Sequence, residues 1–255
     1  QETSADAQLL QDTTHYRVFE VSGNMSSARA SYFHKSIGGY SAVKPQRMQQ
    51  LFDYQITKNN MEVLNMLNVK YIIQTDEKGN ELPLQNPDIN GNAWFVSAVK
   101  WVNSADAEMK ALPQLDSKNT AIVNKTEFGT LLTERSFAKD STASIQAIDY
   151  KPNAIRYQSQ NAQKGLAVFS EMYYAEGWNA YIDGKKTPHI RVDYVLRALE
   201  IPAGNHTVEF KFEPEVVQKG STIALYSSAG MLVLIALGLY YERRKTWFSS
   251  VEPKE

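Results

Sequence analysis

Cysteine is absent from the 255 residues of this chain. Disulfide frameworks, thiolate nucleophiles and cysteine-ligated metal sites are therefore excluded. An excess of one charge is also lacking, because 27 lysines and arginines stand against 28 aspartates and glutamates. Since nucleic-acid-binding domains usually carry a strong basic excess, we expect no nucleic-acid partner. The four histidines lie far apart without partners at metal-ligand spacing, so we expect no metal site and no cofactor.

Charged side chains are missing from residues 220–241, which are mostly Ala, Leu, Ile, Val and Tyr. A helix of about 19 such residues spans the hydrocarbon core of a bilayer. Tyr226 at one end, with Tyr240 and Trp247 at the other, resembles the aromatic belts of membrane interfaces. The alternative is a buried core helix, but core helices of soluble proteins are rarely apolar on every face. We therefore predict a transmembrane helix over 220–241, with the membrane lipid bilayer as its partner.

The orientation of this helix follows from the basic residues after it. Glu242-Arg243-Arg244-Lys245 comes next, and the positive-inside rule places such a cluster in the cytoplasm. We thus expect residues 242–255 to form a cytoplasmic basic tail and residues 1–218 to be extracytoplasmic. The sequence starts QETSADAQLL, without the charged and apolar regions of a signal peptide. Translocation then requires either a cleaved signal peptide or upstream transmembrane helices of the same protein.

The expected fold class is α+β, with a small α/β domain at residues 12–133. Apolar patterning in this part predicts strands at His15–Val21, Val69–Gln74, Ala93–Val102 and Thr120–Asn124. Helical spacing occurs in "KPQRMQQLFDYQ", in "NNMEVLNMLN" and in "SADAEMKALP", where Ser104 is the expected N-cap. Helices and strands that alternate in this way are typical of a mixed sheet.

Residues 141–216 have the strand-and-turn rhythm of an antiparallel β-sandwich. Asp183-Gly184 suits a type I′ hairpin turn, and residues 202–205 (Pro-Ala-Gly-Asn) predict a second hairpin. Val208, Phe210 and Phe212 alternate with charged residues, which indicates a strand with one buried face. The chain is therefore expected to consist of the α/β domain, this β-sandwich and the C-terminal transmembrane helix.

Acidic residues are missing between Glu20 and Asp53. The first two-thirds of this stretch has no clear periodicity, and long irregular loops in compact domains tend to be functional or disordered. Interleaved aromatic residues argue against disorder, and the mixture of guanidinium, ammonium and hydroxyl groups suits a phosphate or another anion. A solvated loop with a chance gap in acids is the alternative. The candidate ligand-binding residues in the stretch are Arg29, Tyr32, His34, Lys35, Tyr40, Lys44 and Arg47.

Trp178, in the aromatic stretch "EMYYAEGWNAY", is a further candidate ligand-binding residue. Exposed aromatic rings can stack on sugar faces, whereas aromatic clusters in β-sandwiches more often belong to the core. Both interpretations remain open for Trp178 from the sequence.

Three carboxylates, Glu171, Glu176 and Asp183, lie near one another in the sequence. A pair about 5–10 Å apart could hydrolyse a glycosidic bond, but nothing in the sequence makes these three converge. We therefore predict no catalytic residue in this chain.

Arg197 is in phase with the apolar positions of its strand, so it is either an edge residue or a partly buried cation. We expect it to form a structural ion pair.

Longer segments of the sequence are distinctive: "YRVFEV", "MLNVKYIIQ", "NAWFVSAVKWV", "MYYAEGWNAYIDGKKT" and "VLRALEIPAGNHTVEFKFEP", followed by the apolar run and "ERRK". In order and spacing they resemble the C-terminal portion of the YfhO-like bacterial membrane proteins, from about Tyr16 to Lys245. Those many-spanning proteins are similar to GT-C-type glycosyltransferases, which transfer a sugar from a polyprenyl-phosphate donor to a glycan or other acceptor outside the membrane.

The resemblance implies a bacterial plasma (inner) membrane protein whose partners are a polyprenyl-phosphate-linked sugar and an acceptor glycan. In GT-C enzymes the catalytic carboxylate lies in an early extracytoplasmic loop, a segment that this chain does not contain. The resemblance therefore implies a C-terminal region that shapes donor or acceptor binding, with the catalytic residues outside the chain. A single-pass, membrane-tethered glycan-binding or adhesion module without enzymatic activity is the alternative, and a purely structural role is a third.

Overall fold

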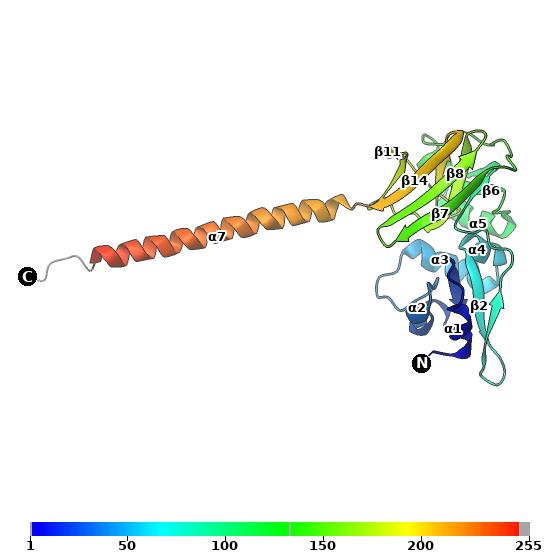
Figure 1. The fold of residues 1–255 in the computed structure, drawn as a ribbon, viewed down its shortest axis with the longest axis horizontal. Coiled ribbons are helices and arrows are strands. Elements are labelled where there is room, and N and C mark those ends of the chain that lie inside the picture. Colours follow the sequence, from blue (N-terminus) through cyan, green and yellow to red (C-terminus); the bar gives the residue numbers. More distant parts are fainter. Residues whose placement is uncertain (1, 133, 250–255) are drawn as a thin grey trace, which may run out of the picture. The chain divides into compact units, whose positions relative to one another are not determined.

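The computed structural model of the protein describes residues 2–132 and 134–249, and the fold is α+β, as expected (Figure 1). The chain forms two compact units, Gln1–Phe212 and Glu213–Glu255. The described helices are α1 (Ser4–Leu9), α2 (Ala28–Phe33), α3 (Gln46–Tyr54), α4 (Met61–Met66), α5 (Ala105–Ala111), α6 (Lys125–Phe128) and α7 (Glu215–Ser249), with the 3-10 turns η1 (Asn24–Ser26), η2 (Ile56–Lys58) and η3 (Leu112–Gln114).

Three sheets make up the framework of the first unit. The described strands are β1 (Arg17–Glu20), β2 (Val69–Thr75), β3 (Glu81–Gln85), β4 (Ala93–Val96), β5 (Ala98–Val102), β6 (Thr120–Asn124), β7 (Ser144–Lys151), β8 (Ala154–Asn161), β9 (Gly165–Met172), β10 (Trp178–Ile182), β11 (Lys185–Thr187), β12 (Ile190–Val192), β13 (Leu196–Ile201) and β14 (Gly204–Phe212). The smallest sheet has the order β1-β2-β3, with β1 and β2 parallel and β2 and β3 antiparallel.

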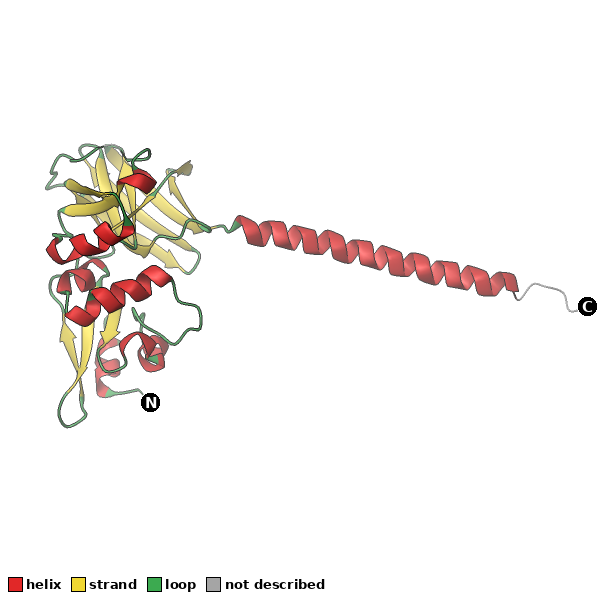
Figure 2. Ribbon diagram, turned by 180° about the vertical axis from the view of Figure 1, so that it is seen from behind, coloured by secondary structure: helices red, strands yellow, loops and turns green. Residues whose placement is uncertain are grey.

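The β-sandwich consists of a five-stranded sheet, β11-β10-β14-β8-β7, and a six-stranded sheet, β4-β9-β13-β12-β6-β5 (Figure 2). Strand β9 shows why its sequence has no polar–apolar alternation. Ala167 and Phe169 belong to the core between the two sheets, whereas Leu166 and Val168 belong to the core on the opposite face. A strand that is covered on both faces is apolar throughout.

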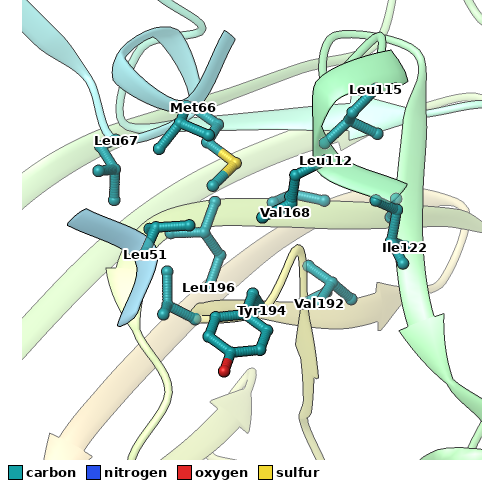
Figure 3. Close-up of a cluster of buried hydrophobic side chains, with 14 of the residues drawn as sticks. Leu51, Met66, Leu67, Leu112, Leu115, Ile122, Val168, Val192, Tyr194 and Leu196 are labelled. Carbon is teal, nitrogen blue, oxygen red and sulfur yellow. The ribbon is translucent and has the colours of Figure 1, made fainter. Parts of the chain in front are cut away.

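Helices cover that opposite face of the six-stranded sheet. Figure 3 shows Leu51 of α3 and Met66 of α4 packed with Val168 of β9 and Leu196 of β13. The six-stranded sheet itself takes β4, β5 and β6 from before residue 133, and β9, β12 and β13 from after residue 141. The division that we expected between 133 and 141 stays a prediction, and residue 133 lies outside the described residues.

Several predicted elements are confirmed, including α3, α4, α5 with its N-cap Ser104, β2 and β6. The Asp183-Gly184 turn is also confirmed, with φ angles of 50° and 80° between β10 and β11. The predicted irregular loop between Glu20 and Asp53 is wrong in part, because it contains α2, which Ser27 caps by accepting a hydrogen bond from the backbone of Ala30.

Two strand predictions are wrong. The single strand expected over 93–102 is interrupted at Ser97, and its halves pair at opposite edges of one sheet, β4 with β9 and β5 with β6. Because one residue joins the two edge strands, this sheet curls back on itself. The hairpin expected at 202–205 is instead a crossover, since β13 pairs within the six-stranded sheet and β14 within the five-stranded sheet.

The described part of the second unit contains the helix α7. Its segment Glu215–Arg244 is long and apolar enough to cross a membrane and includes the predicted span 220–241. The helix starts before that span with polar residues, where Lys219 pairs with Glu215 at 2.9 Å. Residues 250–255 of the expected cytoplasmic tail lie outside the described residues.

Candidate functional site

Two of the predicted ligand-binding residues, Arg29 and His34, meet at the buried carboxylate of Asp6. Arg29 Nη1 lies 2.5 Å from Asp6 Oδ2, and His34 Nε2 lies 2.9 Å from Asp6 Oδ1. Arg29 also pairs with Glu81 at 2.5 Å and with Glu20 at 3.4 Å. Burial by itself would raise the pKa of Asp6, but its hydrogen bonds and the charge of Arg29 outweigh burial and lower it. The charge of Arg29 is therefore matched within the fold.

Arg47 belongs to a different network. Its guanidinium lies over the Tyr194 ring at 4.6 Å, donates to the Tyr194 carbonyl oxygen at 3.2 Å and pairs with the buried Glu108 at 3.3 Å. Burial is the main reason that the pKa of Glu108 is raised, although Arg191 and Arg47 act in the opposite direction. Arg47 thus holds a turn of the protein in place.

Lys44, Tyr32 and Tyr40 are three further predicted residues of the stretch. Lys44 Nζ donates to the Met25 carbonyl oxygen at 2.8 Å, and Tyr32 and Tyr40 are more than four-fifths exposed. The stretch itself contains no acidic residue, but acidic residues from other elements pair with its basic residues. The sequence of the stretch does not reveal these pairings. Its ligand-binding role as one loop stays a prediction.

The two other predicted residues, Lys35 and Trp178, belong to a charged cluster at one end of the sandwich. Glu171 extends from β9 on the same face as Phe169, and Arg197 is the register partner of Phe169 on β13. We call this group the Glu171 cluster; its members are His15, Arg17, Lys35, Tyr150, Glu171, Trp178 and Arg197.

The contacts of the cluster run from one member to the next. Arg17 Nη2 lies 2.9 Å from Glu171 Oε1. The ring centroids of Tyr150 and His15 are 3.6 Å apart, and Lys35 Nζ lies 4.7 Å from the centroid of the Tyr150 ring. Sequence reasoning missed Arg17 and His15, because their strand carries no signal that it faces the sandwich.

Arg197 is the most deeply buried cation of the cluster, with 2% of its surface exposed. Its Nε donates to the Met172 carbonyl oxygen at 2.7 Å, and its guanidinium lies over Trp178 at 4.2 Å and over Phe210 at 5.0 Å. Within the described part of the chain, Arg197 forms no ion pair, and Nη1 is buried without a hydrogen-bond partner. The structural ion pair that we expected is therefore replaced by contacts with aromatic rings.

The cluster holds more positive than negative charge. Three cations, Arg17, Lys35 and Arg197, surround the single carboxylate of Glu171. Burial and the charge of Lys35 lower the pKa of His15 to about 4, so His15 is neutral near pH 7. Burial, with Arg17 adding to it, also lowers the pKa of Lys35, and burial lowers that of Arg197 to about 10.

Buried polar atoms without a hydrogen-bond partner accompany this surplus of charge. In addition to Arg197 Nη1, both ring nitrogens of His15 are buried without a partner among the described residues. Buried polar atoms in folded proteins nearly always have a partner, and cationic donors pair best with phosphate or carboxylate oxygens. The cluster is therefore chemically suited to an anion.

The cluster lies at the end of the first unit from which the chain leaves. Trp178 is the register partner of Phe212, the last residue of that unit, and their ring centroids are 5.4 Å apart. Only two residues separate Phe212 from the start of α7 at Glu215.

Two of the three acidic residues that we considered for hydrolysis, Glu171 and Asp183, have structural partners. Glu171 pairs with Arg17, while Asp183 lies 2.6 Å from His206 Nδ1 and accepts a hydrogen bond from the Thr207 backbone at 2.9 Å. Across residues 2–132 and 134–249, no group of three or more histidines and acids could hold a metal ion.

The comparisons with known proteins cover part of the chain. A search of curated proteins and a search of solved structures found no significant match. Residues 117–224 match the model of a family described as bacterial membrane protein YfhO. This segment begins just before β6, ends within α7 and contains Glu171, Trp178 and Arg197. Over residues 117–224 the chain is therefore similar to the YfhO family of bacterial membrane proteins.

Proposed function

We propose that this chain is the extracytoplasmic C-terminal region of a membrane glycosyltransferase-like protein whose catalytic residues lie outside it. In this proposal α7 crosses the bacterial plasma membrane, with residues 1–218 outside and the basic C-terminus in the cytoplasm. The family match and the apolar helix support a membrane protein. The basic residues after the helix support the orientation.

The Glu171 cluster binds the phosphate of the polyprenyl-phosphate-linked sugar donor. The observation that carries this assignment is the buried, unpartnered Nη1 of Arg197 inside a cluster with surplus positive charge. A polyprenyl tail lies in the bilayer, so its phosphate lies at the membrane surface. Along the chain, two residues separate Phe212, the register partner of Trp178 in the cluster, from the start of the apolar helix α7.

Each residue of the cluster has its own role in binding the phosphate. Arg197 is fixed by the Met172 carbonyl oxygen and by Trp178, so its Nη1 is pre-oriented and little entropy is lost when it binds. Lys35 is exposed and can move onto the phosphate from the solvent side. Glu171 keeps Arg17 in place and offsets part of the repulsion among the three cations.

The experiment compares two lipids that differ only in the phosphate. The chain is placed in nanodiscs that contain either polyprenyl phosphate or the uncharged polyprenol, and its melting temperature is measured. Because a ligand that binds the folded state stabilises it, we expect a higher melting temperature with the phosphate. Lys35→Ala should remove most of that difference. Lys118→Ala changes the charge equally at another exposed lysine and should leave the difference intact.

Equal melting temperatures in the two lipids would rule out the phosphate site. A difference that Lys35→Ala and Lys118→Ala reduce equally would point to general attraction between the chain and an anionic surface.

Stacking of a sugar on Trp178 is not supported, since the Arg197 guanidinium lies over its ring and the Phe212 ring packs against it. The tethered glycan-binding alternative, which rests on the whole aromatic stretch of the sandwich, stays a prediction.

A further inference from the structure

A groove of about 730 Å³ opens on the helical side of the first unit. Helix α3 and the turn η2 form one wall, and α5 forms the other. The residue Tyr194, from the turn between β12 and β13, completes the lining. We call this hollow the α3–α5 groove; the residues that matter for its chemistry are Gln50, Tyr54, Asn59, Asp106, Lys110 and Tyr194.

We propose that the α3–α5 groove binds an uncharged oligosaccharide chain. Tyr54 is 54% exposed, and its ring offers an apolar face on which the C–H bonds of a pyranose can lie. Amide and carboxylate groups, from Asn59 and Asp106, border the same hollow. Such planar groups donate to and accept from the hydroxyls of a sugar. An aromatic platform together with these groups is what sugar recognition requires.

The polar side chains of the groove are available for a ligand. In the part of the chain that the structure describes, the side chains of Asn59, Asp106 and Lys110 form no hydrogen bond or ion pair. By contrast, Gln55 donates to the Met109 carbonyl oxygen at 3.0 Å and accepts from Asn60 at 2.8 Å. The floor of the groove is therefore fixed while its rim is free to bind.

Tyr194 is held in a conformation that few residues adopt. It has a φ of 73° and follows Asp193 with a φ of 49°, so two consecutive non-glycine residues are left-handed. Strained backbone of this kind concentrates at functional sites. The Tyr194 hydroxyl donates to Gln50 Oε1 at 2.7 Å, and Arg47 lies over the ring at 4.6 Å. The hydroxyl thereby fixes the Gln50 amide at the groove, with its NH₂ group left to donate to a ligand.

The charged side chains that line the groove are of both signs. Lys58 and Lys110 are offset in part by Asp106. Helices and turns form the walls, so the described groove offers no row of strand backbone groups to an extended peptide. The groove shares no residue with the Glu171 cluster, and its assignment does not depend on the proposed phosphate site.

The test uses the full chain in nanodiscs and two neutral probes, cellotetraose and chitotetraose, with binding measured by saturation-transfer NMR and calorimetry. We expect saturable binding of at least one probe. Tyr54→Ala should weaken binding about tenfold or more, because it removes the platform. Tyr174→Ala is the matched control, since Tyr174 has the same exposed fraction of 54% and does not line the groove. Asp106→Ala should also weaken binding without lowering the melting temperature.

Absence of saturable binding of both sugars at about 10 mM would overturn the proposal. At this concentration, a ligand that binds with a free energy of roughly −4 kcal/mol is still detected. Binding that Tyr174→Ala weakens and Tyr54→Ala does not would also overturn it, by moving the sugar to the aromatic strand. Saturable binding of an unstructured peptide without binding of either sugar would show a peptide groove instead. Lys35→Ala should leave sugar binding unchanged, so failure of the phosphate site and failure of the groove are distinguishable.

Discussion

At the scale of single residues, Asp193 places a carboxyl group in the protein interior at a turn. Its carboxyl is fully buried, and Oδ1 accepts a hydrogen bond from the Ile122 backbone at 2.7 Å. Burial, with nearby Glu108 and Glu62 adding to it, raises the pKa of Asp193 to about 8. In the folded protein this side chain therefore carries a proton near pH 7.

This proton makes stability dependent on pH. The unfolded chain loses the Asp193 proton near pH 3.9, whereas the folded protein keeps it up to about pH 8. The folded state binds more protons between these values, so stability falls as the pH rises from about 4 to about 8. Asp193→Asn retains the acceptor and suits the positive φ. We expect the melting temperature of this variant to fall less than that of the wild type between pH 5 and pH 8, and an equal fall would contradict the buried proton.

Gly177 is a second residue whose role is set by its neighbours. A Cβ at this position would overlap the ring of Phe212, next to the Glu171 cluster. Because overpacking forces shifts of the surrounding side chains, we expect Gly177→Ala to cost about 1–3 kcal/mol in denaturant unfolding. Gly220→Ala, which meets nothing within 4 Å, is the control and should not destabilise the chain. Equal stabilities of the two variants would show that Phe212 can move freely.

At the scale of elements, an ion pair links the β10–β11 turn to β14, in addition to the backbone pairing of β10 with β14. Asp183, in the hairpin turn, lies 2.6 Å from His206 Nδ1. The hydrogen bond between them lowers the pKa of Asp183 and raises the pKa of His206. The Asp183 contribution is present above its unfolded pKa and is lost as the pH falls. The His206 contribution is complete below its unfolded pKa and is lost as the pH rises.

The pair therefore stabilises the protein most between about pH 4 and about pH 6.5. His206→Gln should lower the free energy of unfolding at pH 5.5 by less than about 1 kcal/mol, since Asp183 is half exposed and the pair is screened by solvent. At pH 8.5 the loss should be smaller. A loss that is larger at pH 8.5, in urea titrations at both pH values, would contradict an ion pair as its cause.

At the scale of the whole molecule, the chain combines a folded unit with one apolar helix. The YfhO match and the helix support a membrane protein, and the proposed function places the catalytic residues in a part of the parent protein outside this chain. An antibody against residues 1–212 should then detect, in native membranes, a polypeptide several times larger than 28.8 kDa. A band near 28.8 kDa would instead indicate a single-pass tethered module, and the donor site would need a separate catalytic partner.

Features that depend on neighbouring residues in the chain could be predicted from the sequence. The helix α3, the N-cap Ser104 and the Asp183-Gly184 turn are examples, because side-chain periodicity, capping and positive φ angles are local properties. The apolar span within α7 is another, since length and composition are enough to predict it.

The candidate sites depended on contacts between distant residues. The sequence showed Lys35 and Trp178 as candidates, but it did not reveal that Arg17 and Glu171 join them, 154 positions apart in the chain. The crossover at residues 202–205 and the break at Ser97 were missed for the same reason, because pairing partners decide which sheet a strand enters. Composition, local periodicity and turn chemistry thus determined the elements and the membrane helix. Only the tertiary structure decided which charges are matched by buried acids, because burial and long-range pairing set the energy of a charge.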